Sequence, residues 1–205
     1  VVLEILILAV VTLPLLTALF LKVANRFLNE LLTNFITINA ALLSVAVSFF
    51  MFGYLLLDKF KPIKFELFEW YPSPQIIFEF YLDGLSGVMM ILISGLSLVI
   101  QLFSTSYMSK DEKYTKYFEY FNFFVFSMLL LVLSGNFLVM FFGWELVGLS
   151  SYLLISFWYE KNSAAKAGNK AFILNRIGDF GFLIGLMMIL NYFKTVNFVN
   201  IFESV

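Results

Sequence analysis

A single carboxylate interrupts the apolar run Asn136-Phe-Leu-Val-Met-Phe-Phe-Gly-Trp-Glu-Leu-Val-Gly-Leu-Ser-Ser-Tyr-Leu-Leu-Ile-Ser-Phe-Trp158. At about 1.5 Å per helical residue, Glu145 lies roughly 14 Å from the start of this run, near the middle of a hydrocarbon core about 30 Å thick. A charge at that depth costs at least about 2.5–3.5 kcal/mol on insertion scales, and such residues usually mark ion or proton pathways. The run therefore predicts a membrane helix, with Glu145 as a candidate for proton transport.

The composition excludes several classes of protein. Of the 205 residues, 61% are hydrophobic and 13% are charged, so several membrane spans are expected. The net charge of −1 provides no basic surface for nucleic acid. The chain has neither cysteine nor histidine. Because iron–sulfur clusters require thiolates and haem iron usually takes His, Cys, Met or Tyr, we expect no redox centre or other cofactor on it.

Six apolar stretches predict an all-α integral membrane protein of about six transmembrane helices. The first is expected to be a real span and not a signal peptide, because it carries Glu4 and lacks a basic start. Only Ser134-Gly135-Asn136 separate the fourth and fifth stretches, which predicts antiparallel neighbours. The six stretches cover residues 3–23, 35–57, 85–104, 118–133, 137–158 and 172–193.

One sizeable polar interruption lies between the second and third stretches. Ile63–Trp70 and Gln75–Tyr81 partly alternate apolar and charged residues, and Tyr71-Pro72-Ser73-Pro74 separates them. This pattern predicts a β-hairpin on the membrane surface, with a structureless loop as the alternative. The chain is accordingly expected to divide into residues 1–84, with two helices and the hairpin, and residues 85–205, with helices three to six.

The basic residues predict an orientation. Eight of them fall in the first, third and fifth loops, whereas the hairpin segment holds three lysines and the fourth loop has none. The positive-inside rule places the odd loops in the cytoplasm or matrix and the hairpin on the opposite side. The eight residues are Lys22, Arg26, Lys110, Lys113, Lys116, Lys161, Lys166 and Lys170.

Glu145 has a simpler interpretation beside the functional one. It would then be a structural carboxylate, hydrogen-bonded to a neighbouring helix and never titrating. Proton transport is favoured because an acid at mid-depth is expensive unless it is used. Gly143 and Gly148 flank it and would let another helix approach closely, although the same spacing fits simple packing.

The sixth stretch carries a polar start. Arg176 and Asp179 stand three residues apart, close enough on a helix to pair and so to lower each other's cost of burial. Together with Lys166 and Lys170, they are either a polar mouth through which protons reach Glu145 or a charge-paired helix end that only anchors the span. Spacing alone does not separate the two.

The remaining acids are expected to lie in loops and to be solvated, and no phosphate loop, metal-ligand cluster or hydrolase triad is present in the sequence. Asp83 is the exception, because an acid at a helix N-terminus is favourable. The acids expected to be solvated are Glu66, Glu69, Glu79, Asp111, Glu112 and Glu119.

Four blocks carry a resemblance to a known family. They are Asp83-Gly-Leu-Ser-Gly-Val-Met-Met90, Ser106-Tyr-Met-Ser109, Gly143-Trp-Glu-Leu-Val-Gly-Leu-Ser-Ser-Tyr-Leu-Leu154 and Asn175-Arg-Ile-Gly-Asp-Phe-Gly181. In this order the chain resembles NADH dehydrogenase subunit 5, the distal antiporter-like subunit of respiratory complex I. The resemblance runs from about residue 65 to residue 190 and covers the N-terminal part of the family's polypeptide.

The resemblance implies a proton-translocating subunit of NADH:ubiquinone oxidoreductase, related to the Mrp-type cation/proton antiporter subunits. Glu145 matches the family's fifth-span glutamate, which pairs with a lysine on a later, broken helix. Arg176 and Asp179 match a charged pair near the access path, and Lys170 matches a nearby lysine. The hairpin resembles the family's surface hairpin on the side opposite the matrix.

Two departures from the family matter. The family has more than twice as many spans, so the partner lysines are missing here and Glu145 is expected to lack its base within this chain. We therefore expect a second chain that supplies the rest of a split subunit, beside other complex I membrane-arm subunits and lipids, or else a remnant kept for assembly. An Mrp-type antiporter subunit without electron transfer is a further alternative. The second departure is Gln101, where many relatives carry histidine.

The expected location is the mitochondrial inner membrane. The resemblance favours it, as do a split gene and the abundance of phenylalanine, with 27 residues, which is typical of an AT-rich organelle genome.

Overall fold

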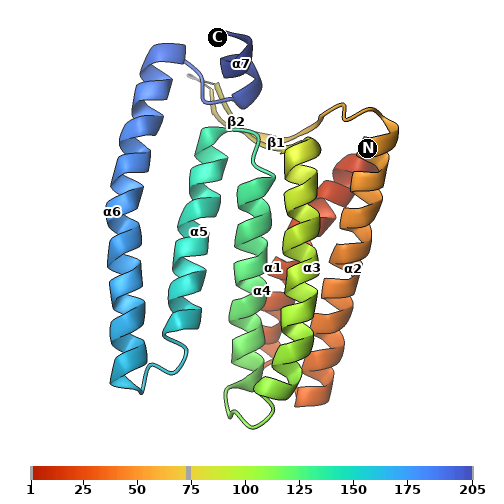
Figure 1. Cartoon of the computed structure of the whole chain (residues 1–205), viewed down its shortest axis with the longest axis vertical. Helices are drawn as coiled ribbons and strands as arrows, with labels where there is room; N and C mark the ends of the chain where they lie inside the picture. The colour runs from red at the N-terminus through yellow and green to blue at the C-terminus, as the bar shows by residue number, and fades with distance from the viewer. Residues whose placement is uncertain (1, 73–74, 205) are drawn as a thin grey trace.

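The computed structural model describes residues 2–72 and 75–204 of the chain. Within these residues, long helices run side by side and a two-stranded hairpin lies across one end of them (Figure 1). The elements in chain order are α1 (Val2–Ala24), α2 (Glu30–Leu57), β1 (Ile63–Pro72), β2 (Gln75–Leu82), α3 (Gly84–Tyr107), α4 (Tyr114–Val132), α5 (Phe137–Ile155), α6 (Asn162–Phe193) and α7 (Phe198–Glu203).

The all-α membrane architecture is confirmed, and each of the six expected stretches forms a long helix. Five of them, α1, α2, α3, α5 and α6, are long and apolar enough to span a membrane. The fourth stretch forms α4, whose first turns carry Lys116 and Glu119 and are more polar. The start of α6 also differs from expectation, because this helix begins at Asn162, ten residues before the expected start at residue 172. The division at residue 84 stays a prediction.

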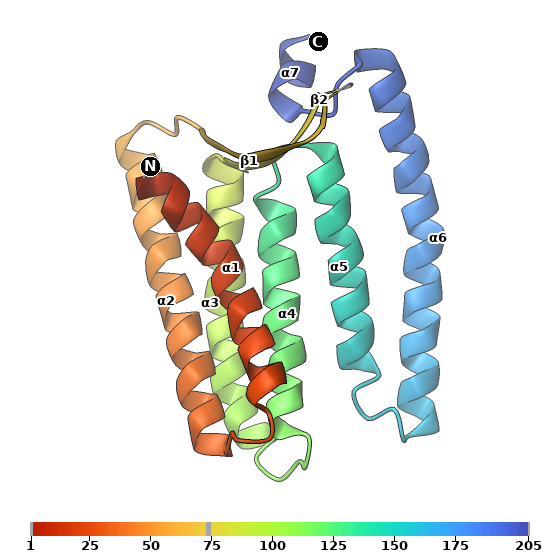
Figure 2. The ribbon, with the colours of Figure 1, turned by 180° about the vertical axis from the view of Figure 1, so that it is seen from behind.

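Helix α4 lies at the centre of the bundle. It contacts α1, α2, α3 and α5, whereas α6 contacts α5 at the outer edge (Figure 2). Because α4 is surrounded by helices, its polar side chains meet protein and do not need to meet lipid. This position explains how a comparatively polar helix can belong to a membrane bundle.

Two groups of buried apolar side chains fill the bundle. The larger lies toward the hairpin end and joins α1, α2, α3, α4 and α5 to β2, with Met51, Met90 and Leu129 fully buried. The smaller lies at the opposite end and includes Leu21, Phe118 and Phe157. Between α2, α3 and α4 the contacts are made largely by small hydroxyl residues, which let membrane helices approach closely. The buried members of this seam include Thr33, Thr37, Ser44, Ser48, Ser94, Ser97 and Thr115.

Gln101 belongs to the same seam. Its side chain is 1% exposed, and its amide lies 3.5 Å from the side-chain oxygen of Asn122 on α4. The position at which the sequence is expected to depart from the family it resembles is therefore a buried polar contact between α3 and α4.

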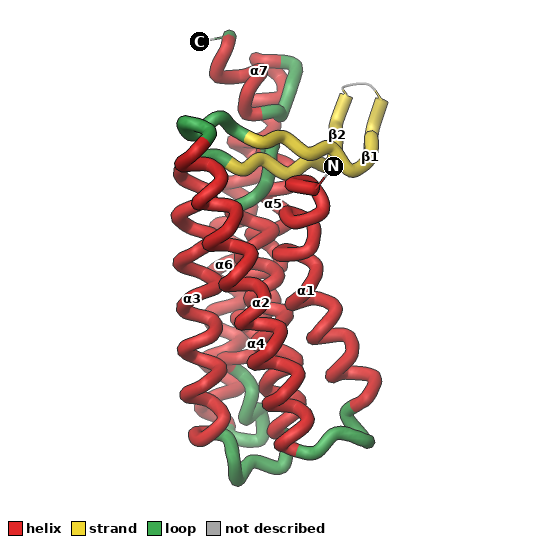
Figure 3. Tube along the Cα trace, turned by 90° about the vertical axis from the view of Figure 1, so that its right-hand side faces the viewer, coloured by secondary structure: helices red, strands yellow, loops and turns green. Residues whose placement is uncertain are grey.

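The expected hairpin forms, with β1 and β2 antiparallel and two bulges in β1. Figure 3 shows it lying across the ends of the helices. Of the expected turn, Ser73 and Pro74 lie outside the described residues. Asp83 follows β2 and starts α3 with a reciprocal capping box, in which it accepts from the Ser86 N–H at 2.8 Å. The expected structural role of Asp83 is thus confirmed.

The turn between α4 and α5 holds the hairpin in place. The Gly135 N–H donates to the Glu79 carbonyl at 3.0 Å, and the Tyr81 N–H donates to the Leu133 carbonyl at 2.8 Å. A Cβ on residue 135 would lie 2.6 Å from the Cγ of Glu79, so only glycine fits here. The segment after α6 joins the same turn, because the Phe198 N–H donates to the Gly135 carbonyl at 3.3 Å.

Glu79 was expected to be solvated, and this expectation is wrong. Its side chain is 1% exposed, with Lys64 Nζ 3.0 Å from one carboxylate oxygen. The other oxygen accepts from the side-chain amides of Asn197 and Asn136. The carboxylate is buried because it gathers three partners from three segments that are distant in the sequence.

Two other acids also differ from expectation. Glu119 lies within α4 and is half-buried. Asp111 accepts a hydrogen bond from the Trp158 indole at 2.8 Å and is likewise half-buried. Glu66, Glu69 and Glu112 are exposed, as expected.

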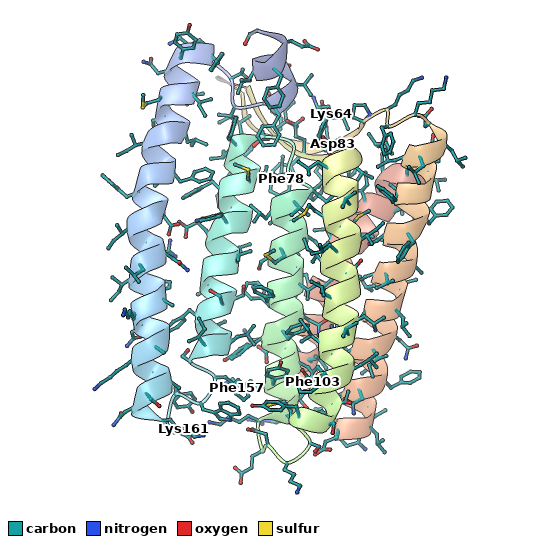
Figure 4. The ribbon with its side chains drawn as sticks, in the orientation of Figure 1. Lys64, Phe78, Asp83, Phe103, Phe157 and Lys161 are labelled. Carbon is teal, nitrogen blue, oxygen red and sulfur yellow. The ribbon has the colours of Figure 1, made fainter. Side chains whose placement is uncertain are left out.

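The odd loops gather at the end opposite the hairpin. In Figure 4, Lys64, Phe78 and Asp83 lie near the hairpin, whereas Phe103, Phe157 and Lys161 lie at the other end. The basic loops therefore share one side of the bundle, which is the arrangement that the positive-inside rule requires. Which compartment this side faces stays a prediction.

Replacing Gly143 by alanine should destabilise the bundle. A Cβ at residue 143 would lie 2.6 Å from the Cα of Leu131, a backbone atom of α4 that cannot move alone. We expect a loss of about 1–3 kcal/mol, the usual cost of overpacking, seen as a lower melting temperature in detergent. Gly95→Ala is the control, because a Cβ there has nothing within 4 Å. Equal melting temperatures for the two variants would contradict the close α4–α5 contact.

Removing the carboxylate of Glu79 should loosen the hairpin. In Glu79→Ala the amides of Asn136 and Asn197 lose their shared acceptor, at about 1–3 kcal/mol for a buried unsatisfied group. Glu66→Ala is the matched control, because Glu66 pairs with the same Lys64 at 2.9 Å but its side chain is 52% exposed. We expect a change within about 0.5 kcal/mol for the control. Thermal unfolding of both variants in detergent measures the difference, and a similar loss in both would show that the pairing with Lys64 alone matters.

Candidate functional site

Glu145 lies in the middle of α5. The helix begins after Asn136, whose side-chain oxygen accepts from the N–H groups of Leu138 and Val139. Glu145 is the ninth residue of this 19-residue helix. Glu145 therefore lies near the middle of the helix, as the sequence predicted. Its side chain is 19% exposed and points toward α6.

Arg176 on α6 forms an ion pair with Glu145 and a second one with Asp179. The guanidinium nitrogen that contacts Glu145 lies 3.5 Å from the Asp179 carboxylate. The expected pairing of Arg176 with Asp179 is confirmed. The expectation of a lysine partner for Glu145 on a later helix stays a prediction. Within this chain, α6 packs along α5 and brings Arg176 to Glu145.

Trp144 completes the cluster. Its indole N–H donates a hydrogen bond to the Asp179 carboxylate, with 2.8 Å between Trp144 Nε1 and Asp179 Oδ1. Asp179 is only 8% exposed, so this bond and the ion pair supply the partners that a buried carboxylate needs. No role for Trp144 was predicted from the sequence. Its place beside a mid-span glutamate was the available signal, since an indole N–H in a membrane helix seeks an acceptor.

The cluster is closed on one side and open on the other. Gly148 brings α6 close, with its Cβ position 3.6 Å from the side chain of Asn175. Arg176 packs over the ring of Phe172, 4.8 Å from its centroid, yet its side chain is 46% exposed. The outward face of α6 carries exposed apolar side chains, which need lipid or another helix beside them. They include Ile173, Leu174, Ile177, Phe180, Ile184, Met187 and Met188.

Lys170 and Lys166 lie outside this cluster. Both are exposed on the first turns of α6. Lys170 precedes Arg176 by six residues, about 9 Å along the helix, and within residues 2–72 and 75–204 no carboxylate lies within ion-pair distance of it. The structure thus brings Glu145, Arg176 and Asp179 together and leaves Lys170 toward the basic end.

The arrangement places two carboxylates on one guanidinium. Arginine keeps its charge in proteins, so any proton exchanged in the cluster must reside on Glu145 or Asp179. With both acids ionised the cluster carries a net charge of −1, which a proton or an approaching cation would neutralise. In the part of the chain that the structure describes, no group of three or more acidic, His or Cys side chains is arranged to hold a metal ion.

Two family models match the chain. Residues 70–118 match the model described as "NADH-Ubiquinone oxidoreductase (complex I), chain 5 N-terminus". Residues 134–205 match the model described as "NADH:quinone oxidoreductase/Mrp antiporter, TM", which covers Glu145, Arg176 and Asp179.

Curated relatives of bacterial and eukaryotic origin are similar over most of the chain. NADH-quinone oxidoreductase subunit L of Rickettsia bellii is 36% identical over 94% of this chain and 30% of its own length. NADH-ubiquinone oxidoreductase chain 5 of Rhizopus stolonifer is 37% identical over 96% of the chain and 30% of its own length. That of Dictyostelium discoideum is 38% identical over 93% of the chain and 28% of its own length. The chain thus spans somewhat less than a third of the length of these relatives.

A solved structure has the same fold. It is a chain from the membrane-bound sulfane sulfur reductase, an archaeal respiratory membrane complex, with a TM-score of 0.81 and 22% identity over 93% of this chain and 38% of that one. The fold, the two family models and the named relatives agree. The chain belongs to the family of NADH:quinone oxidoreductase and Mrp antiporter membrane subunits, in which it corresponds to the N-terminal part of complex I chain 5.

Proposed function

We propose that this chain is the N-terminal part of a proton-translocating membrane-arm subunit of NADH:ubiquinone oxidoreductase, with Glu145 as its titrating acid. The observation that carries the proposal is the cluster at mid-depth, in which Arg176 is shared by Glu145 and Asp179. A cluster of charged side chains is costly to place in a membrane, and charged residues found there usually mark ion or proton pathways.

Each residue has a role in this proposal. Glu145 accepts a proton and becomes neutral, which weakens its attraction for Arg176. The guanidinium then favours Asp179, which is already 3.5 Å away and is held by Trp144. Arg176 and Asp179 tune the access path and the proton affinity of Glu145 through their charges, and Lys170 lies about two turns nearer the basic end.

The oxidoreductase activity belongs in this proposal to the whole complex. The chain supplies part of the proton path, and NADH oxidation and electron transfer take place on other subunits that hold the redox centres. A cation/proton antiporter subunit is the second candidate, because the family model over residues 134–205 is shared with Mrp antiporters. Co-purification with a flavin- and cluster-containing arm distinguishes the two.

Glu145→Gln tests the proton role. It keeps the size of the side chain and its hydrogen bonding but cannot titrate. We expect fewer protons translocated per electron in sealed vesicles, with NADH oxidation by the peripheral arm to an artificial acceptor unchanged. Glu112→Gln, at an exposed position in the loop between α3 and α4, is the control and should pump normally. An unchanged proton-to-electron ratio in Glu145→Gln would leave the chain a structural subunit.

We further propose that this chain works beside other membrane-arm subunits of the complex, and that the complex lies in the mitochondrial inner membrane. Support comes from the chain-5 relatives of Rhizopus and Dictyostelium and from the open side of the Arg176 cluster, where further helices would bring lysines within reach of Glu145.

The composition of the native complex tests this second proposal. The membrane complex is isolated from purified organelles on a mild-detergent gel, and its chains are identified by mass spectrometry. We expect this chain together with other hydrophobic membrane-arm subunits and with the subunits that hold the redox centres. A complex without such subunits would refute the membrane-arm assignment, and recovery only from a bacterial membrane would refute the location.

A further inference from the structure

A groove opens between α1, α4 and α5 at the basic end of the bundle, far from the hairpin. It has a volume of about 580 Å³, within the range of ligand pockets, about 300–1,000 Å³. Its mouth carries Lys22 and Lys116, and its wall is built from Leu15, Leu19, Phe123 and Leu153. Figure 2 shows the lower part of α1 lying beside α4, with α5 next to α4 on its other side. We call this feature the lysine groove.

In the lysine groove, the charged side chains lie near the ends of the helices and the apolar side chains lie deeper in the bundle. Lys22 is in the last turn of α1, and Lys116 is in the first turn of α4. Leu15 and Phe123 each lie seven residues deeper, about 10 Å along their helices. Because α1 and α4 run in opposite directions, both lysines are at the same end and both apolar residues are at the same depth. This is the polarity of a phospholipid, with a charged head over an apolar chain.

Among the described residues, neither ammonium group is held by an ion pair, and Lys116 Nζ lies 5.6 Å from the centroid of the Tyr120 ring. Within residues 2–72 and 75–204, no carboxylate lies within ion-pair distance of Lys22 or Lys116. Glu119 also lines the groove, so the three charged side chains leave a net charge of +1. A smaller cavity of about 180 Å³ adjoins it and shares Lys116, Tyr120 and Leu153. There Lys113 is already paired with Glu160 at 2.6 Å.

The position along the membrane normal fits the same ligand. The lysine groove lies at the end where the basic loops gather, the side expected to face the cytoplasm or matrix. Anionic lipids populate that leaflet, and basic pockets between membrane helices on that side bind their head groups. A soluble phosphate ester would use the lysines but would leave the apolar wall of Leu15, Leu19 and Phe123 without a partner.

We propose that the lysine groove binds one anionic phospholipid, with its phosphodiester between Lys22 and Lys116 and an acyl chain along Leu15, Leu19 and Phe123. The lipid joins α1 to α4 and α5, elements that are distant in sequence. The site is separate from the Glu145 cluster and does not depend on the proposed proton transport.

Native mass spectrometry of the intact membrane complex tests the proposal. The complex is exchanged into detergent that contains equal amounts of phosphatidylglycerol and phosphatidylcholine, and the lipid adducts retained on this chain are measured. We expect phosphatidylglycerol to be retained in preference. In Lys22→Gln/Lys116→Gln its affinity should fall about fivefold for each lysine, the effect of about 1 kcal/mol per basic residue near the surface. Lys110→Gln/Lys166→Gln, which removes two exposed lysines outside the groove, should bind like the parent.

Leu19→Trp separates the acyl chain from the head group. This side chain is 49% exposed, and tryptophan there would add bulk to the apolar wall of the groove while both lysines remain in the chain. We expect reduced retention of phosphatidylglycerol in this variant, which also tests the proposal if the double lysine variant fails to assemble. Equal retention of the two lipids by the parent complex would overturn the proposal, as would an equal loss in the control. Displacement of the lipid by millimolar inorganic phosphate would show a phosphate site and would also overturn it.

Discussion

A polar group inside a bilayer must find its partner within the protein, and this constraint organises the bundle. The acid at mid-depth in α5 is tolerated because α6 brings Arg176 to it, and Asp179 is tolerated because the indole of Trp144 and the same guanidinium meet it. The hydroxyl seam between α2, α3 and α4 follows the same rule with neutral groups. Thr37, Ser48, Ser94 and Ser97 bond to backbone carbonyls about one turn earlier, as Ser48 does with Ser44 at 2.7 Å. Thr33 and Thr115 bond to each other across the seam at 3.1 Å, whereas the buried Ser44 hydroxyl has no hydrogen-bond partner among the described residues.

At the hairpin end, a buried polar group also finds its partners within the protein, but these partners come from the hairpin, the α4–α5 turn and the segment before α7. Gly135 has no side chain, so the hairpin backbone approaches the α4–α5 turn, and the carboxylate of Glu79 then serves Lys64 from β1, Asn136 from the turn and Asn197 from the segment before α7. One buried acid thereby fixes three segments to the same place. The start of α5 is among them, so the hairpin anchor and the position of Glu145 along the membrane normal are connected through one continuous helix.

The sequence predicted what depends on local pattern. Apolar length located the long helices, alternation located the hairpin, and a spacing of three predicted the pairing of Arg176 with Asp179. Contacts between distant segments were not predictable in this way. The side-chain amides that donate to Glu79 lie 57 and 118 residues away along the chain, and nothing near Trp144 in sequence indicates Asp179 as its acceptor. The short helix α7 was missed for the same reason, since Phe198 is held by a ring contact of 4.7 Å with Phe137 on α5.

The shared guanidinium is also what makes the cluster a candidate for movement and not only for support. A single carboxylate with a single arginine would be neutral and satisfied, with no reason to exchange a proton. Two carboxylates on one arginine leave an excess negative charge, which is costly at mid-depth and which a proton relieves. Because arginine cannot release its own proton, the relief must come from outside the pair. Arg176 is exposed on the same side as the apolar face of α6, so whatever covers that face also controls how the proton or a further cation arrives.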